Sequence, residues 1–508
     1  METQRTATHP GTPDQLGSRR QAPDSAAAPS GWKLPAALGL LAFCVAFVGL
    51  WIPSFWDDEI ATISAARRTP GELLLLLQSV DAVHGLYYLF MHFWTSVFGF
   101  SEIAMRIPSA LAVGLACAGT TVIGRKLGSP TAGIAAGLVL AFLPRMVWAG
   151  TEARQSAFTA LLAVALTLLL LRAWESNRVL DWVLYGLCAA VGVWMFMFFV
   201  LAVMAHAAAA VILRRRVIGT LVASALAGAT VLPFLLHTLG QKAQVDWIQN
   251  RSLAQILMTA AVKQFFYGDD RPTNNAPPQW VLGSMLVLGV LEVGLVVWGI
   301  WAARRHGRHR TLIVLGLSII ILPALGLLLV TLVAQPVYVA RYLTFTAPAF
   351  ALLVGLGISQ LPARKAWLRP VALAAVVLCS LVPQLTIKSV VNEPADTERR
   401  IARMLDGELP RPAAVVFGEP YLRDLALAYP EHFDGVADLA LAESPAESGT
   451  LWGVNSPVSA RDLARRGNVL YVGQGGAPAN LAAFAEAGCR ETGHRPFERM
   501  LLISFTCS

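Results

Sequence analysis

Long apolar runs separated by short polar segments fill the sequence between residues 33 and 387. A transmembrane helix needs about 20 predominantly apolar residues, and eleven runs approach or exceed that length. They are 33–52, 105–125, 130–150, 155–174, 180–197, 198–213, 217–236, 279–303, 311–333, 338–360 and 368–387. The pattern predicts a polytopic α-helical membrane protein with about 11 transmembrane helices.

A twelfth apolar run, 84–98, is short for a crossing and contains His84 and His92. Charge decides its place, because short cytoplasmic loops carry an excess of Lys and Arg. If the N-terminus is cytoplasmic and this run does not cross, every basic cluster falls on the cytoplasmic side: Arg125-Lys126, Arg172 and Arg178, Arg214–Arg216, Arg304–Arg310 and Arg364-Lys365-Arg369. The run is therefore predicted to lie at the outer surface, in a first extracytoplasmic loop at 53–104. A later outer loop spans 237–278.

The two ends of the chain differ from this membrane part. Residues 1–32 are rich in Pro, Ala, Ser, Gly and Thr, which predicts a disordered cytoplasmic tail. Residues 33–387 form the predicted transmembrane domain. Residues 388–508 read as a small extracytoplasmic domain, in which strand-like runs alternate with helical patterns and predict an α/β layer. Cys489 and Cys507 of this domain are candidates for a disulfide, since oxidation is permitted outside the cytoplasm.

Composition agrees with a membrane protein. The chain is 56% hydrophobic and 14% charged, whereas soluble domains carry about 25% charged residues. The net charge of +8 is distributed as clusters between apolar runs, and no stripe of basic and aromatic residues indicates a nucleic-acid surface. The lipid bilayer, at the plasma membrane, is the predicted environment.

Ionisable residues gather on the predicted outer face. The first apolar run is followed by three consecutive acids, Asp57, Asp58 and Glu59. The same first loop contributes Asp81 and His84. Other outward segments contribute Glu152, Arg154, His237, Lys242, Asp246, Arg251, Lys263, Tyr267, Tyr338, Arg341 and Tyr342. A base for an acceptor and cations for a phosphate are what group transfer from a charged lipid needs. The simpler alternatives are that Asp57 or Asp58 caps a helix and that Glu152 and Arg154 form an interfacial ion pair.

Six segments in a fixed order resemble the membrane glycosyltransferases of the GT-C superfamily, in particular the protein O-mannosyltransferases, aminoarabinose transferases and bacterial relatives. The segments are FWDDEIAT after the first run, DAVHGLYYLFMHFW (81–94), AMRIPSALAVGLACAGTTVIGRKLG (104–128), EARQSAF (152–158), VDWIQNRSLAQIL (245–257) with FFYG (265–268), and ARYLTFTAPAFALL (340–353). The likeness covers about residues 33–385. Amphipathic helices on the outer face of the first loop are a further feature of this family.

The resemblance implies roles for these residues. The family's Asp-Glu pair falls on Asp58 and Glu59; Asp58 is expected to act as general base or to orient the acceptor hydroxyl, and Asp57 is a third, adjacent acid. Arg154, Arg341, Lys263, Glu152 and Tyr342 are the candidates for donor or phosphate contacts, and Asp81, His84 and Tyr87 for acceptor or loop positioning. This sequence departs from the family at Val83-His84-Gly85, where relatives read His-Pro-Pro, and at Ser156, where relatives commonly have Tyr.

The implied reaction is inverting transfer of a sugar from a polyprenyl-phosphate donor to a cell-envelope glycan, lipid or protein. Mannose is the preferred sugar, and arabinose or another sugar is the alternative. A transporter or flippase for a lipid-linked intermediate is a second class, disfavoured because no internal repeat is visible and the charges lie at one surface. An inactive scaffold is a third. No cofactor is implied; a divalent cation is compatible with the acids, although no metal-ligand set is visible. The residue usage resembles actinobacterial proteins.

Overall fold

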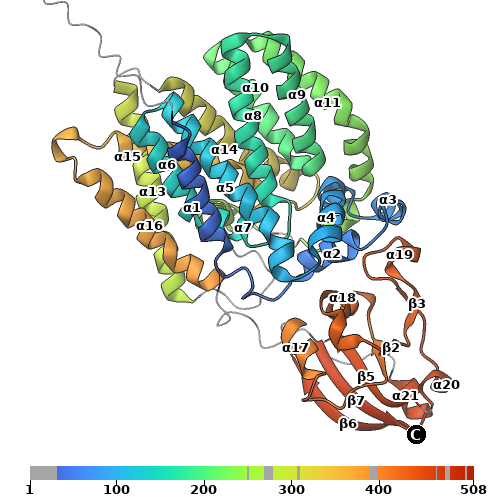
Figure 1. The fold of residues 1–508 in the computed structure, drawn as a ribbon. Coiled ribbons are helices and arrows are strands. Elements are labelled where there is room, and N and C mark those ends of the chain that lie inside the picture. Colours follow the sequence, from blue (N-terminus) through green and yellow to red (C-terminus); the bar gives the residue numbers. More distant parts are fainter. Residues whose placement is uncertain are drawn as a thin grey trace, which may run out of the picture. The chain divides into compact units, whose positions relative to one another are not determined.

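Each apolar run predicted to cross the membrane contains a helix (Figure 1). The structure is a computed structural model that describes residues 31–248, 251–267, 278–305, 309–388, 398–464, 466–474, 481–497 and 500–508. Apart from Gly31 and Trp32, the predicted tail lies outside these residues. The helices of the apolar runs are α1 (Lys33–Phe47), α5 (Glu102–Leu127), α6 (Pro130–Phe142), α7 (Pro144–Gly150), α8 (Ser156–Ser176), α9 (Val179–Met195), η2 (Met197–Phe199), α10 (Val200–Leu213), α11 (Val217–Gly240), α13 (Gln279–Arg305), α14 (Arg310–Val333), η5 (Ala340–Thr346), α15 (Ala347–Ser359) and α16 (Leu368–Ile387).

Among the described residues, seven helices are long and apolar enough to span a bilayer, counting η5 with α15 as one. The pair α6 and α7 makes an eighth if it is one span bent by 59°. The remaining predicted spans, in α1, α9 and η2–α10, are apolar helices of at most 17 residues. A multi-pass helical membrane protein is confirmed, and the total of about 11 crossings stays a prediction.

The first predicted span is shorter than its apolar run. The run reaches Ile52, but α1 ends at Phe47, and Gly49 adopts a left-handed conformation with φ +88°. The ammonium of Lys388, just after α16, donates hydrogen bonds to the carbonyls of Val45, Ala46 and Val48. These are the carbonyls that a helix end leaves unsatisfied, so a residue far along the chain closes the first helix.

The segment between α1 and α5 folds into α2 (Asp57–Ala66), α3 (Pro70–Ser79), η1 (Ala82–His84) and α4 (Gly85–Phe98). Thr69 and Glu72 form a capping box at the start of α3, with Pro70 at its first position, a combination that favours helix initiation. Asp81 joins α3 to η1 with φ +59°. The run 84–98 is thus a helix of 14 residues, and its predicted place at the outer surface stays a prediction.

The C-terminal region is a small α/β domain, as predicted. Its helices and turns are α17 (Glu398–Met404), η8 (Pro420–Arg423), α18 (Asp424–Ala428), η9 (Pro430–Phe433), α19 (Pro445–Ser448), α20 (Ala460–Leu463) and α21 (Ala482–Glu486). One sheet has the order β2 (Ala437–Asp438), β1 (Ala414–Phe417), β5 (Gly467–Gln474), β7 (Met500–Cys507), β6 (Arg490–Pro496); the second pairs β3 (Leu441–Glu443) with β4 (Val454–Asn455). β1 runs parallel to β2 and β5, and β7 is antiparallel to its neighbours. Cys489, just before β6, and Cys507, at the end of β7, form a disulfide.

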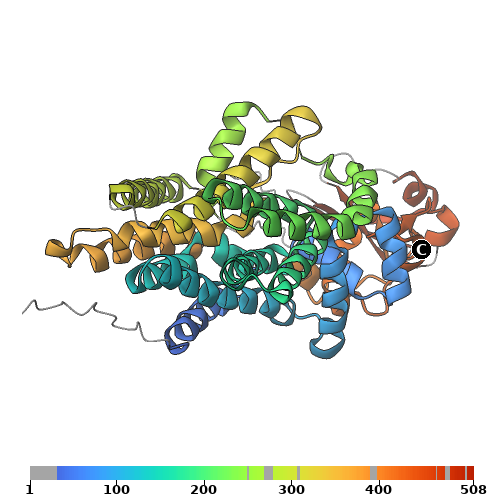
Figure 2. The same ribbon diagram turned by 90° about the horizontal axis from the view of Figure 1, so that it is seen from above.

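This domain packs against the helices of the first loop (Figures 1 and 2). Buried side chains of both regions share one hydrophobic cluster, which includes Ile60, Ile63 and Met91 on one side and Leu422, Leu425 and Leu470 on the other. The guanidinium of Arg68, itself 2% exposed, donates hydrogen bonds to the carbonyls of Pro445, at 2.8 Å, and Thr450. The segment that leads from α19 to β4 is thereby fixed to α2.

Candidate functional site

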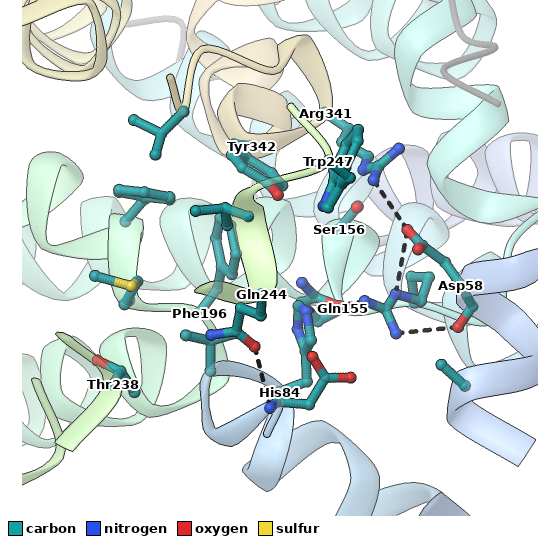
Figure 3. A pocket seen from close by; sticks show the side chains of 18 of the residues that line it. Asp58, His84, Gln155, Ser156, Phe196, Thr238, Gln244, Trp247, Arg341 and Tyr342 are labelled. Atoms are coloured by element: carbon teal, nitrogen blue, oxygen red, sulfur yellow. Dashed lines mark hydrogen bonds and ion pairs between the residues drawn. The ribbon is translucent and has the colours of Figure 1, made fainter. Parts of the chain in front are cut away.

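A cavity of about 260 Å³ lies where the first loop, the C-terminal domain and several membrane helices meet. Its walls come from α2, η1, the turn between α7 and α8, η2, the end of α11, η3 (Lys242–Val245), η5 and the segment after α19. Nine of the residues selected from the sequence line it: Asp57, Asp58, Asp81, His84, Glu152, Arg154, Lys242, Arg341 and Tyr342. Residues separated by almost 300 positions in the chain therefore face one space (Figure 3).

Asp58 stands in the first turn of α2, with 28% of its side chain exposed. Its Oδ2 lies 3.1 Å from Nη2 of Arg341 and 3.9 Å from Nε of Arg154 (Figure 3). The carboxylate is thus reachable from the cavity and held between two cations. Such a group can accept a proton from a hydroxyl that enters the cavity.

Arg341 enters the cavity from η5. Its guanidinium lies 5.3 Å from the ring centroids of Trp56 and Trp247 and 5.9 Å from that of Tyr342. Aromatic faces stabilise a cation and restrict a long side chain. Arg341 therefore presents a positioned planar fork suited to two oxygens of a phosphate.

Arg154 is anchored on nearly every side. It donates hydrogen bonds to the carbonyl of Asp58 at 3.0 Å, to Thr62 Oγ1 at 3.3 Å, to the Tyr88 hydroxyl at 3.2 Å and to His84 Nε2 at 2.9 Å. The pKa of Arg154 is raised: burial opposes this, but Tyr88, Asp58 and Asp81 outweigh it. Arg154 therefore joins α2, η1 and α4 around the cavity and adds a fixed positive charge.

His84 and Asp81 have shifted pKa values. Burial, followed by the charges of Arg154 and Arg341, holds the pKa of His84 well below its ordinary value. The imidazole is therefore neutral and accepts the hydrogen bond from Arg154. Burial raises the pKa of Asp81, although Arg154 and a 2.7 Å hydrogen bond from Tyr88 oppose the shift. His84 thus contacts Arg154, and Asp81 contacts Tyr88, at the wall of the cavity; their predicted role in loop positioning stays a prediction.

Glu59 was expected to act beside Asp58, but the structure turns it away from the cavity. Successive helix residues point about 100° apart, and Glu59 is fully buried against α5. Its carboxylate accepts hydrogen bonds from Arg106 at 2.7 and 2.6 Å and from the amide of Ala153 at 2.8 Å. A carboxylate engaged in this way supports the fold and does not reach a substrate in the cavity.

Tyr87 and Lys263 also lie away from the cavity. Tyr87 is fully buried, and its neighbour Tyr88 contacts Arg154 and Asp81 instead. Lys263 ends a short π-helical turn, η4 (Thr259–Lys263), and its ammonium lies 5.7 Å from the ring of Tyr267. Neither is among the residues that line the cavity.

Glu152 is the least explained acid of the site. It lines the cavity and is 3% exposed, and neither carboxyl oxygen has a hydrogen-bond partner within the described part of the chain. Burial raises the pKa of Glu152 well above its ordinary value, with Arg341 opposing the shift. The interfacial ion pair between Glu152 and Arg154 that was considered from the sequence is not formed.

Several residues of the cavity were not selected from the sequence. Trp247, Gln155 and Gln244 line it, as do Leu451 and Trp452 of the C-terminal domain. Trp247 lies in one of the segments that resemble the family, but it carries no charge and does not stand out among the ionisable groups. Leu451 and Trp452 belong to no sequence pattern that connects them with residues some 400 positions earlier.

Three carboxylates, Asp57, Glu398 and Asp424, come within 4.8 Å of one another through single oxygens. In the described residues they are the group with the spacing of a metal-ligand set, at the contact between α2 and the C-terminal domain. Asp58 and Glu152 do not belong to it.

Comparison with known proteins agrees with this architecture. The family model of dolichyl-phosphate-mannose-protein mannosyltransferases matches residues 86–239. ArnT from Cupriavidus metallidurans is similar in structure in the apo state, with 12% identity, a TM-score of 0.59 and coverage of 92% of this chain and 97% of that one. The structure of the same protein bound to undecaprenyl phosphate shows 13% identity and a TM-score of 0.53, and the match covers 94% of this chain and 98% of that one.

A third similar structure is the archaeal oligosaccharyltransferase AglB from Archaeoglobus fulgidus, in complex with an inhibitory peptide and a dolichol-phosphate. Its identity is 10% and its TM-score 0.52, and the match covers 86% of this chain and 69% of that one. No curated protein matches the sequence. At these identities the structural likeness concerns the fold. The chain therefore has the fold of these membrane proteins, and its residues 86–239 match the mannosyltransferase family model.

Proposed function

We propose that the protein transfers a sugar from a polyprenyl-phosphate donor to a hydroxyl of a cell-envelope acceptor, with inversion at the anomeric carbon. The observation that carries the proposal is the contact between Asp58 and Arg341 at the wall of the cavity. A reachable carboxylate and a positioned guanidinium are the base and the phosphate ligand that this displacement requires.

In the proposed reaction the acceptor oxygen attacks the anomeric carbon while the bond from that carbon to the phosphate oxygen breaks. Asp58 accepts the hydroxyl proton, and the polyprenyl phosphate leaves with the bonding electron pair. Arg341 binds the phosphate oxygens, on which negative charge increases. Its engagement with phosphate weakens its hold on Asp58, so donor binding makes the carboxylate more available to the acceptor.

We assign the two substrates to different parts of the cavity lining. Met197, Phe198 and Val337 are apolar, and the side chains of Leu239 and Val330 are also exposed on their helices, so these residues suit a polyprenyl chain in the bilayer. Leu451 and Trp452 of the C-terminal domain offer an apolar and an aromatic side chain to an acceptor, and Asp57 offers a carboxylate.

Mannose is the first candidate donor sugar because the matching family model describes mannosyltransferases, and arabinose is the alternative. We assign the cavity to the outer face of the plasma membrane, with a cytoplasmic N-terminus and an extracytoplasmic C-terminal domain. The basic clusters favour this orientation, and the Cys489–Cys507 disulfide is compatible with an oxidising compartment outside the cytoplasm.

The test is sugar transfer in membranes from a panel of labelled polyprenyl-phosphate sugars, comparing wild type with Asp58→Asn and Asp57→Asn. Removal of a general base typically costs about 10²–10⁴-fold in rate, so we expect Asp58→Asn to lose transfer at unchanged protein level while Asp57→Asn keeps most of it. The reverse order would move the base to Asp57. No transfer by wild type from any donor would reject the proposed function.

A further inference from the structure

Glu152 sits in the turn between α7 and α8 and lines the same cavity as Arg154 and Arg341. Its side chain is 97% buried, and no described group hydrogen-bonds to either of its carboxyl oxygens. The other acids nearby are all engaged: Glu59 with Arg106, Asp58 with Arg341, and Asp81 with Tyr88. A buried carboxyl group without a partner, on a residue of the cavity wall, indicates a ligand that completes its hydrogen bonds.

The charges around Glu152 do not hold it ionised. Arg341 and Arg154 attract its negative charge, but their guanidinium groups are committed to Asp58, to its carbonyl and to His84, while Asp58 and Glu59 repel it. Because burial outweighs these charges, the pKa of Glu152 lies well above its ordinary value. A neutral carboxyl group differs from an ionised one in that it carries an O–H donor.

We propose that Glu152 acts as a neutral carboxylic acid that donates a hydrogen bond to a phosphate oxygen of the polyprenyl-phosphate ligand. The inference rests on the proposed function, because it places the donor phosphate beside Arg341. It separates Glu152 from Asp58, which has to be ionised in order to accept a proton.

Phosphate binding and protonation of Glu152 support each other. An anion in the cavity disfavours a second negative charge beside it and so favours the protonated carboxyl group further. By linkage, ionisation of Glu152 weakens binding of the phosphate by the same factor. Affinity therefore falls as the pH rises and Glu152 loses its proton, the opposite of what a general base or a metal ligand at this position requires.

The experiment measures binding of undecaprenyl phosphate to the purified full chain between pH 6 and pH 9.5 for wild type, Glu152→Gln and Glu152→Ala. The amide of glutamine has the shape of the neutral acid, donates a hydrogen bond and does not titrate. We expect Glu152→Gln to bind within about threefold of wild type at pH 6 and Glu152→Ala to bind about tenfold more weakly, as loss of a hydrogen bond to a charged group predicts. The thermal stability of each variant is the control for folding.

At high pH we expect wild type to lose affinity relative to Glu152→Gln. The phosphate of the probe titrates with a pKa near 6, but it does so with both proteins, so their ratio isolates Glu152. Binding by Glu152→Gln as weak as that by Glu152→Ala, or a wild-type affinity that rises with pH relative to Glu152→Gln, would overturn the inference and favour a base or metal-ligand role. If wild type does not bind undecaprenyl phosphate at any pH, the proposed function itself fails.

Discussion

Arg106 of α5 and Glu59 of α2 form a fully buried ion pair through two hydrogen bonds of 2.7 and 2.6 Å. Arg106 also donates to the carbonyls of Leu50, Pro53 and Ser54. One guanidinium thus fixes the segment between α1 and α2, and with it the position of Asp58. The three consecutive acids therefore have different environments: Glu59 is buried and supports the fold, while Asp57 and Asp58 line the cavity.

Removing one partner of a buried pair leaves an uncompensated charge, which typically costs about 3–5 kcal/mol. We expect Glu59→Gln and Arg106→Gln to lower the melting temperature of the purified protein strongly. Lys126→Gln is the matched control, because its ion pair with Glu175 is 40% and 51% exposed and such pairs contribute about 0–1 kcal/mol. Melting temperatures as high as that of the control would show that Glu59 and Arg106 do not support the fold.

Arg341 provides a test of phosphate binding. Arg341→Lys keeps the charge but loses the planar fork, so we expect KM for the donor to rise about tenfold, and more in Arg341→Ala. Steady-state transfer at varied donor concentration measures the effect. Arg310→Lys is the control, since Arg310 begins α14 and contacts the carbonyl of Ile212, away from the cavity. An unchanged KM in Arg341→Ala would remove Arg341 from the donor site.

Trp452 provides a test of the acceptor assignment. We expect Trp452→Ala to raise KM for the acceptor several-fold, because the aromatic face it adds to the cavity wall is lost, and to leave binding of undecaprenyl phosphate unchanged. Leu441→Ala, in β3 of the same domain and 37% exposed, is the control. A loss confined to donor binding would assign Trp452 to the donor instead of the acceptor.

His84 makes stability depend on pH. Its pKa in the folded protein lies well below its ordinary value, so the unfolded chain binds the proton more readily. The stabilisation is complete above the unfolded pKa of about 6.5 and declines as the pH falls from there towards the folded pKa. We expect the melting temperature of wild type to fall more steeply below pH 6.5 than that of His84→Gln, whose amide oxygen still accepts from Arg154.

His92→Gln is the control for this measurement. His92 lies on α4, the helix that follows His84, and its ring contacts the carbonyl of Ala66 instead of an arginine. We expect its pH profile to follow wild type. Parallel profiles for wild type and His84→Gln would mean that His84 does not carry the pH dependence.

The membrane helices could be predicted because a spanning helix is apolar along its whole length, so each one leaves a long, unambiguous run. Their ends were harder: α1 stops five residues before its run does, since Gly49 turns the chain and Lys388 satisfies the last carbonyls. Gly49 lies within residues 33–52, but Lys388 does not, and no local pattern in that run contains its contribution.

The candidate site was found in part for a similar reason. Charged groups at the ends of apolar runs are conspicuous, which led to Asp58, Arg154 and Arg341. Whether an acid faces the cavity is decided by about 100° of helix rotation and by the residue opposite, so Asp58 and Glu59 could not be told apart. Trp452 reaches the cavity only through tertiary packing, which no spacing in the sequence encodes.

The hydrogen bonds of Arg68 to Pro445 and Thr450 also join parts of the chain that are made at different times. Leu451 and Trp452 follow the membrane helices described above, so one wall of the cavity is synthesised after its acids and arginines. The cavity is complete only when the C-terminal domain has folded onto the helices of the first loop.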